Sequence, residues 1–168
     1  MKSLLAVVVA LLGMSQDVEN PQFKYWTSCK PGSWVKMKME MASAGKKIES
    51  ETTHKLLELK DDVAVVEITG KSKVGEQEFA LPTQKQEIKA KEPADKIKIT
   101  SEGDEEIEVA GKKLKCHWFE YSGKQGEKDS KGKAWMSKEI PGGMAKIEVG
   151  GPDAAKPIVM VAVEWEKK

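Results

Sequence analysis

The sequence predicts a mainly β protein, in which a curved antiparallel sheet of about ten strands, a half-barrel or open barrel, wraps around a short N-terminal helix. Two observations predict the sheet. Apolar and charged residues alternate along several segments, as in Val35–Met41, and this period of two is typical of a strand with one buried face. Turn residues also recur every 8 to 12 residues or so. The helix is predicted from one short segment, which begins with a residue that can cap a helix and a proline that fits its first turn.

The N-terminus has the layout of a secretory signal peptide. Lys2 supplies a positive charge, Leu4 to Leu12 is an unbroken apolar run, and the chain turns polar from Gly13. We therefore expect residues 1–16 to be removed on export and residues 17–168 to form a single β domain that is periplasmic or secreted. A buried N-terminal strand or helix is the alternative. Met14 stands where the lipid-bearing cysteine of a lipoprotein would be, so no lipid anchor is expected.

The helix is predicted just after the signal segment. Asn20 can cap it, Pro21 fits its first turn, and Phe23 and Trp26 fall on one face. Lys30-Pro31-Gly32 ends the element. A helix this short is stable only when its apolar face docks on something larger.

Strands are predicted for most of the remaining chain, with proline, glycine and charged turns between them. The expected strands are Val35–Met41, Ile48–Leu59, Val63–Thr69, Lys73–Leu81, Thr83–Lys89, Lys96–Ser101, Glu105–Val109, Leu114–Ser122, Lys133–Ser137, Ala145–Val149 and Ile158–Trp165. The expected turns and loops are Ala44-Gly45-Lys46, Lys60-Asp61-Asp62, Pro82, Pro93, Ala110 to Lys113, Gly123–Gly132, Ile140 to Met144 and Pro152–Pro157.

The charge balance excludes several partners. Lysine and arginine together number 28 against 27 acidic residues, all of the basic residues are lysine, and the net charge is +1. Such a surface lacks the basic footprint of a nucleic-acid-binding protein, and without arginine it lacks the usual bidentate phosphate clamp. No second apolar stretch is long enough to span a bilayer, so no stable membrane insertion is expected after signal removal.

Cys29 and Cys116 are the two cysteines. In an exported chain they could form one disulfide, which would contribute roughly 4 kcal/mol by restricting the unfolded chain. The alternative is that each is a separate buried thiol that packs as a small hydrophobe.

No arrangement typical of an enzyme is recognisable. His54 lies within a strand among threonine and lysine, and His117 directly follows Cys116, so these neighbours point to opposite faces and cannot easily bind one metal ion. No nucleophile motif or phosphate-binding loop is present. The acidic run Asp104-Glu105-Glu106 is typical of a solvated edge. We therefore predict a non-enzymatic protein with no metal and no cofactor.

The apolar residues suggest a binding face. Leu114, Cys116 and Trp118 point to one side of their strand while Phe119 and Tyr121 point to the other, and aromatic residues on both faces imply either a cover or a cavity. Methionine rows accommodate varied apolar ligands. The candidate ligand-binding residues are Met37, Met39, Met41, Trp118, Trp135, Phe23 and Trp26. In the alternative interpretation the helix fills that face and these residues are ordinary core.

One part of the chain resembles a known group of proteins. The motifs are Glu106 to Cys116, then Trp118 and Tyr121, then Trp135-Met136-Ser137 and Ile140 to Lys146. They resemble uncharacterised exported bacterial proteins, several from planctomycetes, in which a G-x-x-x-x-C strand precedes a W-x-S strand and a P-G-G bend. These are similar to periplasmic domains related to the lipoprotein-carrier half-barrels. The resemblance covers residues 104–148, with weaker support from residues 21–35. It implies a curved antiparallel sheet around a short helix and no catalytic residues.

These observations lead to two functional hypotheses. The first is a non-enzymatic exported protein that binds an apolar small molecule, a lipid or a partner segment in the cleft of the half-barrel. The second is a structural or envelope-interaction protein with a fully plugged core, no ligand cavity, and an envelope protein as its partner. An open apolar cleft would favour the first, and a filled interior the second.

Overall fold

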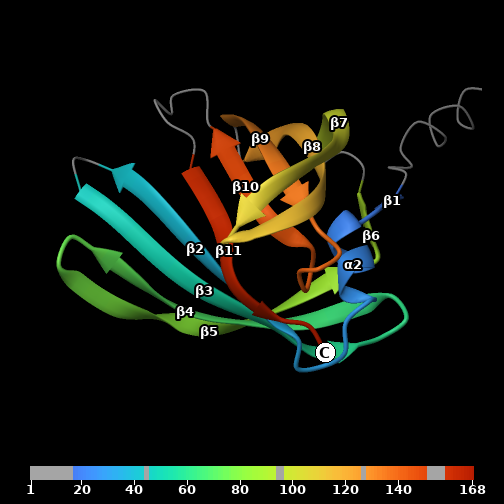
Figure 1. Cartoon of the computed structure of the whole chain (residues 1–168), viewed down its shortest axis with the longest axis horizontal. Coiled ribbons are helices and arrows are strands. Elements are labelled where there is room, and N and C mark those ends of the chain that lie inside the picture. Colours follow the sequence, from blue (N-terminus) through green and yellow to red (C-terminus); the bar gives the residue numbers. More distant parts are fainter. Residues whose placement is uncertain (1–16, 44–45, 94–96, 126–127, 151–157) are drawn as a thin grey trace, which may run out of the picture.

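A single open antiparallel sheet dominates the computed structural model, which describes residues 17–43, 46–93, 97–125, 128–150 and 158–168. Nine strands follow the order β5-β4-β3-β2-β11-β10-β9-β8-β7 (Figure 1). Their bounds are β2 Trp34–Ser43, β3 Lys46–Leu59, β4 Val63–Val74, β5 Gln77–Lys89, β7 Ile97–Val109, β8 Lys112–Gln125, β9 Lys128–Met136, β10 Met144–Gly150 and β11 Ile158–Glu166.

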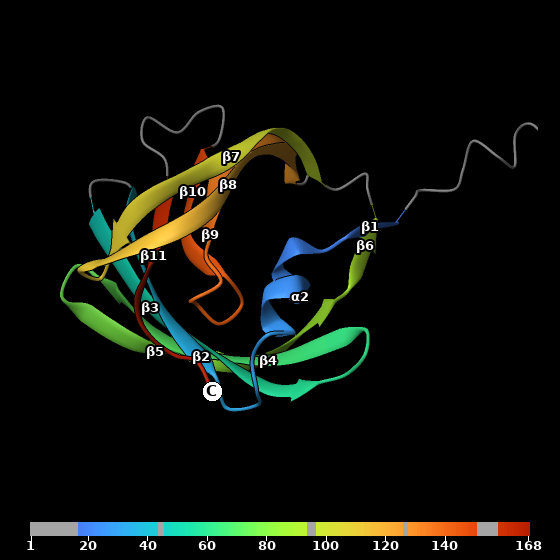
Figure 2. The same ribbon diagram turned by 45° about the vertical axis from the view of Figure 1, so that its right-hand side comes forward.

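The sheet curves around the short helix α2 (Pro21–Trp26), which lies inside the curve as seen in Figure 2. The sheet is not closed, because β5 and β7 stand at opposite ends of the strand order. Two further strands, β1 (Asp17–Glu19) and β6 (Lys91–Pro93), form a separate pair beside the helix. The prediction of a mainly β half-barrel around an N-terminal helix is confirmed.

The division of the chain into strands differs from the predicted one in several places. The segment Lys73–Leu81 is not one strand, because a tight turn at Gly75 separates β4 from β5. Pro82 lies inside β5 instead of ending a strand, which is possible because β5 is an edge strand and needs no donor on its outer side. The predicted strands Lys96–Ser101 and Glu105–Val109 are not separate, because β7 runs without a break from Ile97 to Val109; Lys96 lies outside the described residues.

The hairpin around residues 123–132 is more regular than predicted. Gly123 to Gln125 extend β8, and Lys128 to Gly132 already belong to β9, so the pairing continues almost to the tip. The signal segment 1–16, the turn at Ala44-Gly45 and the loop Pro152–Pro157 lie outside the described residues.

Two apolar clusters form the core. The larger cluster lies among β2, β7, β8, β9, β10 and β11, and comprises Val35, Met37, Val109, Leu114, Cys116, Trp135, Ile140, Ala145 and Ala162. The smaller cluster joins α2 to β3, β4 and β5, and comprises Phe23, Trp26, Cys29, Leu56, Ala64, Val66 and Ile88. The helix therefore fills the curve over one half of the sheet.

A capping hydrogen bond and a proline define where helix α2 begins, and the packing of its apolar side chains stabilises it. The Asn20 side chain accepts a hydrogen bond of 2.9 Å from the backbone N–H of Gln22, and Pro21 occupies the first turn. Trp26 is 1% exposed. Burying a large apolar side chain contributes roughly 1.5–3 kcal/mol, which a six-residue helix needs because it is unstable alone.

The bend between β9 and β10 holds the other side of the helix. Gly142 and Gly143 have φ angles of +71° and +79°. A Cβ atom at Gly142 would lie 2.5 Å from Cε2 of Trp26, and one at Gly143 would meet the ring of Tyr25. Glycine is required here both for the left-handed backbone and for the close approach of the two rings.

Gly142→Ala should destabilise the protein by about 2 to 4 kcal/mol, because it adds left-handed strain and a clash with Trp26. Gly111→Ala is the matched control: Gly111 also has a positive φ, +74°, but nothing lies within 4 Å of its Cβ position. The control should lose only about 1–2 kcal/mol from strain. Urea denaturation of both variants measures the difference, and equal losses would contradict the docking role of Gly142.

His54 should make stability depend on pH. Its half-buried ring lies on β3 beside the Thr52 hydroxyl, at 3.1 Å, and burial lowers the pKa of His54. The unfolded chain therefore binds a proton more readily, and the free energy of unfolding should fall as the pH drops below about 6.5. His54→Gln should show a smaller decrease between pH 7.5 and 5.5 in thermal denaturation. An identical decrease in both proteins would refute this assignment.

Candidate functional site

The sequence-predicted ligand residues are divided between the two apolar clusters. Met37 and Trp135 belong to the larger cluster, and Trp118 packs against it. Phe23 and Trp26 belong to the smaller cluster. Met39 and Met41 are half-buried on β2, opposite Ser50 and Ile48 of β3. The structure therefore brings together Met37, Trp135 and Trp118, and places the helix residues elsewhere.

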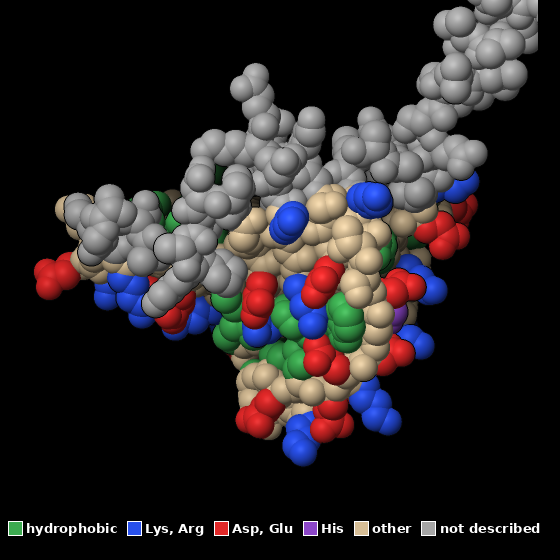
Figure 3. Space-filling view, turned by 90° about the horizontal axis from the view of Figure 1, so that it is seen from above, with side chains coloured by type: hydrophobic (Ala, Val, Ile, Leu, Met, Phe, Trp, Pro, Cys, Tyr) green, Lys and Arg blue, Asp and Glu red, His purple; other side chains and the backbone are tan. Residues whose placement is uncertain are grey.

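The two tryptophans are covered by charged side chains. Trp118 and Trp135 stand directly opposite each other on β8 and β9. Lys133 Nζ lies 4.0 Å from the Trp118 ring centre and 4.8 Å from that of Trp135. Glu105 accepts a hydrogen bond from Trp135 Nε1, which is the main reason that the pKa of Glu105 is lowered. Figure 3 shows apolar side chains bordered by lysines and carboxylates on the face seen from above.

The two cysteines do not form the disulfide that was considered from the sequence. Both are buried free thiols. Cys29 packs with the helix-side cluster and its Sγ–H donates to the Tyr25 carbonyl at 3.5 Å, whereas Cys116 belongs to the larger cluster. Their placement in separate cores explains why they remain unpaired, since a disulfide needs Cα atoms within about 7 Å.

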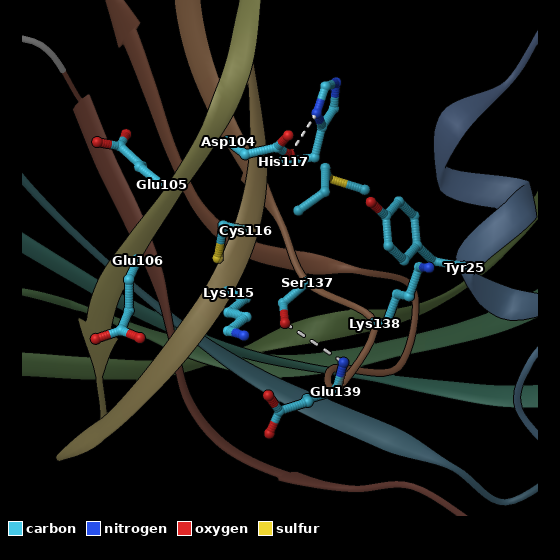
Figure 4. A pocket seen from close by; sticks show the side chains of 11 residues that line it. Tyr25, Asp104, Glu105, Glu106, Lys115, Cys116, His117, Ser137, Lys138 and Glu139 are labelled. Atoms are coloured by element: carbon cyan, nitrogen blue, oxygen red, sulfur yellow. Dashed lines mark hydrogen bonds and ion pairs between the residues drawn. The ribbon is translucent and has the colours of Figure 1, made fainter.

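A hollow of about 580 Å³ lies on the open side of the half-barrel, between α2 and the β7–β8 hairpin. Figure 4 shows Tyr25 pointing from the helix toward β8, and the segment after β9 closing one side. The lining residues are Tyr25, Asp104, Glu105, Glu106, Lys115, Cys116, His117, Met136, Ser137, Lys138 and Glu139.

The lining combines apolar and acidic groups. Tyr25, Cys116 and Met136 supply the apolar part. Four carboxylates and two lysines supply the charges, so the formal charge of the lining is negative when histidine is neutral. Hollows of about 630 and 370 Å³ elsewhere on the surface are lined mainly by polar residues, and neither is lined by the predicted methionines.

His117 and Asp104 form a polar pair at the rim. His117 Nδ1 lies 3.0 Å from Asp104 Oδ1, and His117 Nε2 lies 3.5 Å from Glu102 Oε2. His117 on β8 stands directly opposite Asp104 on β7, and both side chains are exposed. As expected from strand alternation, His117 points away from its buried neighbour Cys116.

Burial keeps the Tyr25 hydroxyl and the Cys116 thiol, which both line the hollow, protonated. The pKa of Tyr25 is raised first by burial, and then by electrostatic interaction with Cys116 and Asp104. The pKa of Cys116 is raised from 9.0 to about 11 by burial and by the nearby carboxylates of Glu105 and Glu139. A thiol in this state is a poor nucleophile, because the thiolate is the reactive form. The arrangement therefore suits the binding of a positively charged group better than covalent chemistry.

Sequence reasoning missed Tyr25, Asp104 and Ser137 as parts of one site. These residues come from α2, β7 and the segment after β9, and only the fold brings them together. One signal was present in the sequence: Glu102, Asp104, Glu106 and Glu108 alternate with a period of two, which is the period of a strand.

No known protein helps to assign the site, since no family model, curated protein or solved structure matches the chain. Within the described residues, no helix is long and apolar enough to cross a membrane. The same part of the chain contains no group of three or more histidine, cysteine or acidic side chains arranged to hold a metal ion.

Alkylation with iodoacetamide should label both cysteines of the denatured protein without prior reduction, because neither is bonded. In the native protein at pH 8, Cys116 should react slowly, since it is buried and its pKa of about 11 leaves little thiolate. Mass spectrometry counts the labels. Labelling that appears only after treatment with a reductant would show that a disulfide exists.

Proposed function

We propose that the protein is a non-enzymatic binding protein whose working site is the open side of the half-barrel, between α2 and β7. Its ligand is an amphiphilic group that carries a positive charge, either on a small molecule or on a segment of a partner. The N-terminal signal pattern supports a periplasmic or secreted location for this activity.

One observation carries the proposal: the interior is filled where the apolar residues gather, and a hollow remains where the carboxylates gather. Met37 and Trp135 are 2% and 6% exposed, so they offer little surface to a lipid. The hollow instead presents the half-buried ring of Tyr25 beside the exposed side chains of Asp104 and Glu139. An apolar body with a cationic end matches both parts of this lining.

The filled core also favours a second function, that of a structural or envelope-interaction protein. Phe23 and Trp26 occupy the curve over β3 to β5, as a plugged core requires. This alternative predicts that the hollow of about 580 Å³ binds no ligand saturably. The following experiment therefore separates the two functions.

Octylamine, in its ammonium form, should produce saturable NMR shifts of the Tyr25, His117 and Ser137 amides in the ¹⁵N-labelled full chain. Octanoate and octanol share the apolar chain but lack the positive charge, and they should bind more weakly. Glu139→Gln should raise the dissociation constant for octylammonium by about two- to fivefold, since an exposed ion pair contributes up to about 1 kcal/mol.

Glu78→Gln provides the control, because Glu78 is exposed on β5, at the other edge of the sheet. This variant should bind octylammonium as the unmodified chain does. The absence of saturable shifts at the three amides would refute the proposed site and favour the structural alternative. Equal binding of octanoate and octylammonium would refute the role of the carboxylates.

A further inference from the structure

Strand β7 ends the sheet and has one unpaired side. It spans 13 residues and contains no proline, and among the described residues it pairs only with β8. The backbone N–H and C=O groups along its outer side are therefore available for pairing, as at any uncovered sheet edge.

The register shows which residues direct these groups outward. β7 and β8 are joined by Ala110 and Gly111, whose φ angles are +51° and +74°, as in a two-residue type I′ turn. Val109 and Lys112 flank this turn and form its hydrogen-bonded pair. Hydrogen-bonded and non-hydrogen-bonded pairs alternate along an antiparallel ladder. The residues whose backbone N–H and C=O groups point away from β8, toward the open edge, are therefore Glu102, Asp104, Glu106 and Glu108.

Every one of these four positions is acidic, and all four side chains are exposed. Their cationic neighbours lie on the inner strand: Lys113 stands opposite Glu108, and Lys115 opposite Glu106. The Lys113–Glu106 ion pair measures 3.7 Å and both side chains remain largely exposed. In the part of the chain that the structure describes, the outermost row of the sheet is therefore a line of carboxylates with no cationic row beyond it.

We propose that β7 accepts an extended basic segment of a partner protein as an additional strand. This inference rests on the proposed function, because β7 forms one wall of the same open side and Asp104 and Glu106 belong to both. Lysines on the added strand would stand opposite the carboxylates, and such cross-strand pairs of opposite charge stabilise a sheet. Ile99, which is 48% exposed near the start of β7, offers an apolar contact to the same segment.

A second copy of the chain is the wrong occupant for this edge. Two β7 strands would bring carboxylates opposite carboxylates, and like charges directly opposite each other are destabilising. The other edge, β5, is interrupted by Pro82, which has no N–H to donate. The charge and the proline therefore select a basic partner at β7.

A peptide of twelve residues that alternates lysine and valine, with blocked ends, is the probe for strand addition. In the full chain it should protect the Glu102, Asp104, Glu106 and Glu108 amides from hydrogen exchange. A second peptide, N-methylated at its six central residues, keeps the charge but cannot pair, and it should bind at least tenfold more weakly. Isothermal calorimetry measures both affinities.

Glu106→Pro and Glu106→Gln separate the backbone from the charge. Proline removes a donor that faces outward, so the β7–β8 ladder should survive while peptide binding falls at least tenfold. Glutamine removes one charge and should weaken binding only about two- to fivefold. If the proline variant does not fold, the comparison of the two peptides on the unmodified chain decides the question.

Equal affinity of the methylated and unmethylated peptides would overturn the proposal, because attraction of charges alone would then explain binding. Binding of octylammonium without binding of either peptide would also overturn strand addition, and would leave the proposed function standing. Loss of both kinds of binding would refute the proposed function itself.

Discussion

The docking of Tyr25 and Trp26 against two glycines is the contact on which the rest of the structure depends. Phe23 and Trp26 attach α2 to β3, β4 and β5, while the rings of Tyr25 and Trp26 meet the bend between β9 and β10. The helix thus connects strands from the two halves of an open sheet. Among the described residues, the buried Nε1 of Trp26 has no hydrogen-bond partner, which costs about 1–3 kcal/mol. The contact still forms because a buried aromatic side chain removes a large apolar area from water.

The sequence was sufficient to predict the architecture, since alternation and helix capping act locally. Val35–Met41 alternates and is a strand, and Asn20 with Pro21 begins a helix. The errors arose at glycine and proline: Gly75 forms a turn inside a predicted strand, whereas Pro82 and Gly103 lie inside strands where a boundary was predicted. Pro82 is accommodated because it lies on an edge, and Gly103 continues β7 while the Trp118 ring packs over it. Whether a strand is an edge strand depends on the whole topology, which no local pattern contains.

The candidate site was less predictable than the fold. The apolar candidates Met37 and Trp135 are core residues, but the helix residues Phe23 and Trp26, which were expected to cover them in the alternative interpretation, belong to the other cluster. The hollow depends on side chains that are distant in sequence, such as Tyr25 and Asp104, and on the buried state of Cys116. The acidic row was visible in the sequence, but its meaning required the register of the β7–β8 hairpin.

The unequal chemistry of the two sheet ends also bears on how the protein behaves at high concentration. Head-to-tail stacking of open sheets, with the β5 end of one molecule on the β7 end of the next, would build filaments without limit. Pro82 withholds a donor at one end. A half-barrel of this kind can thus keep one pairing surface exposed in a crowded compartment and still remain dispersed.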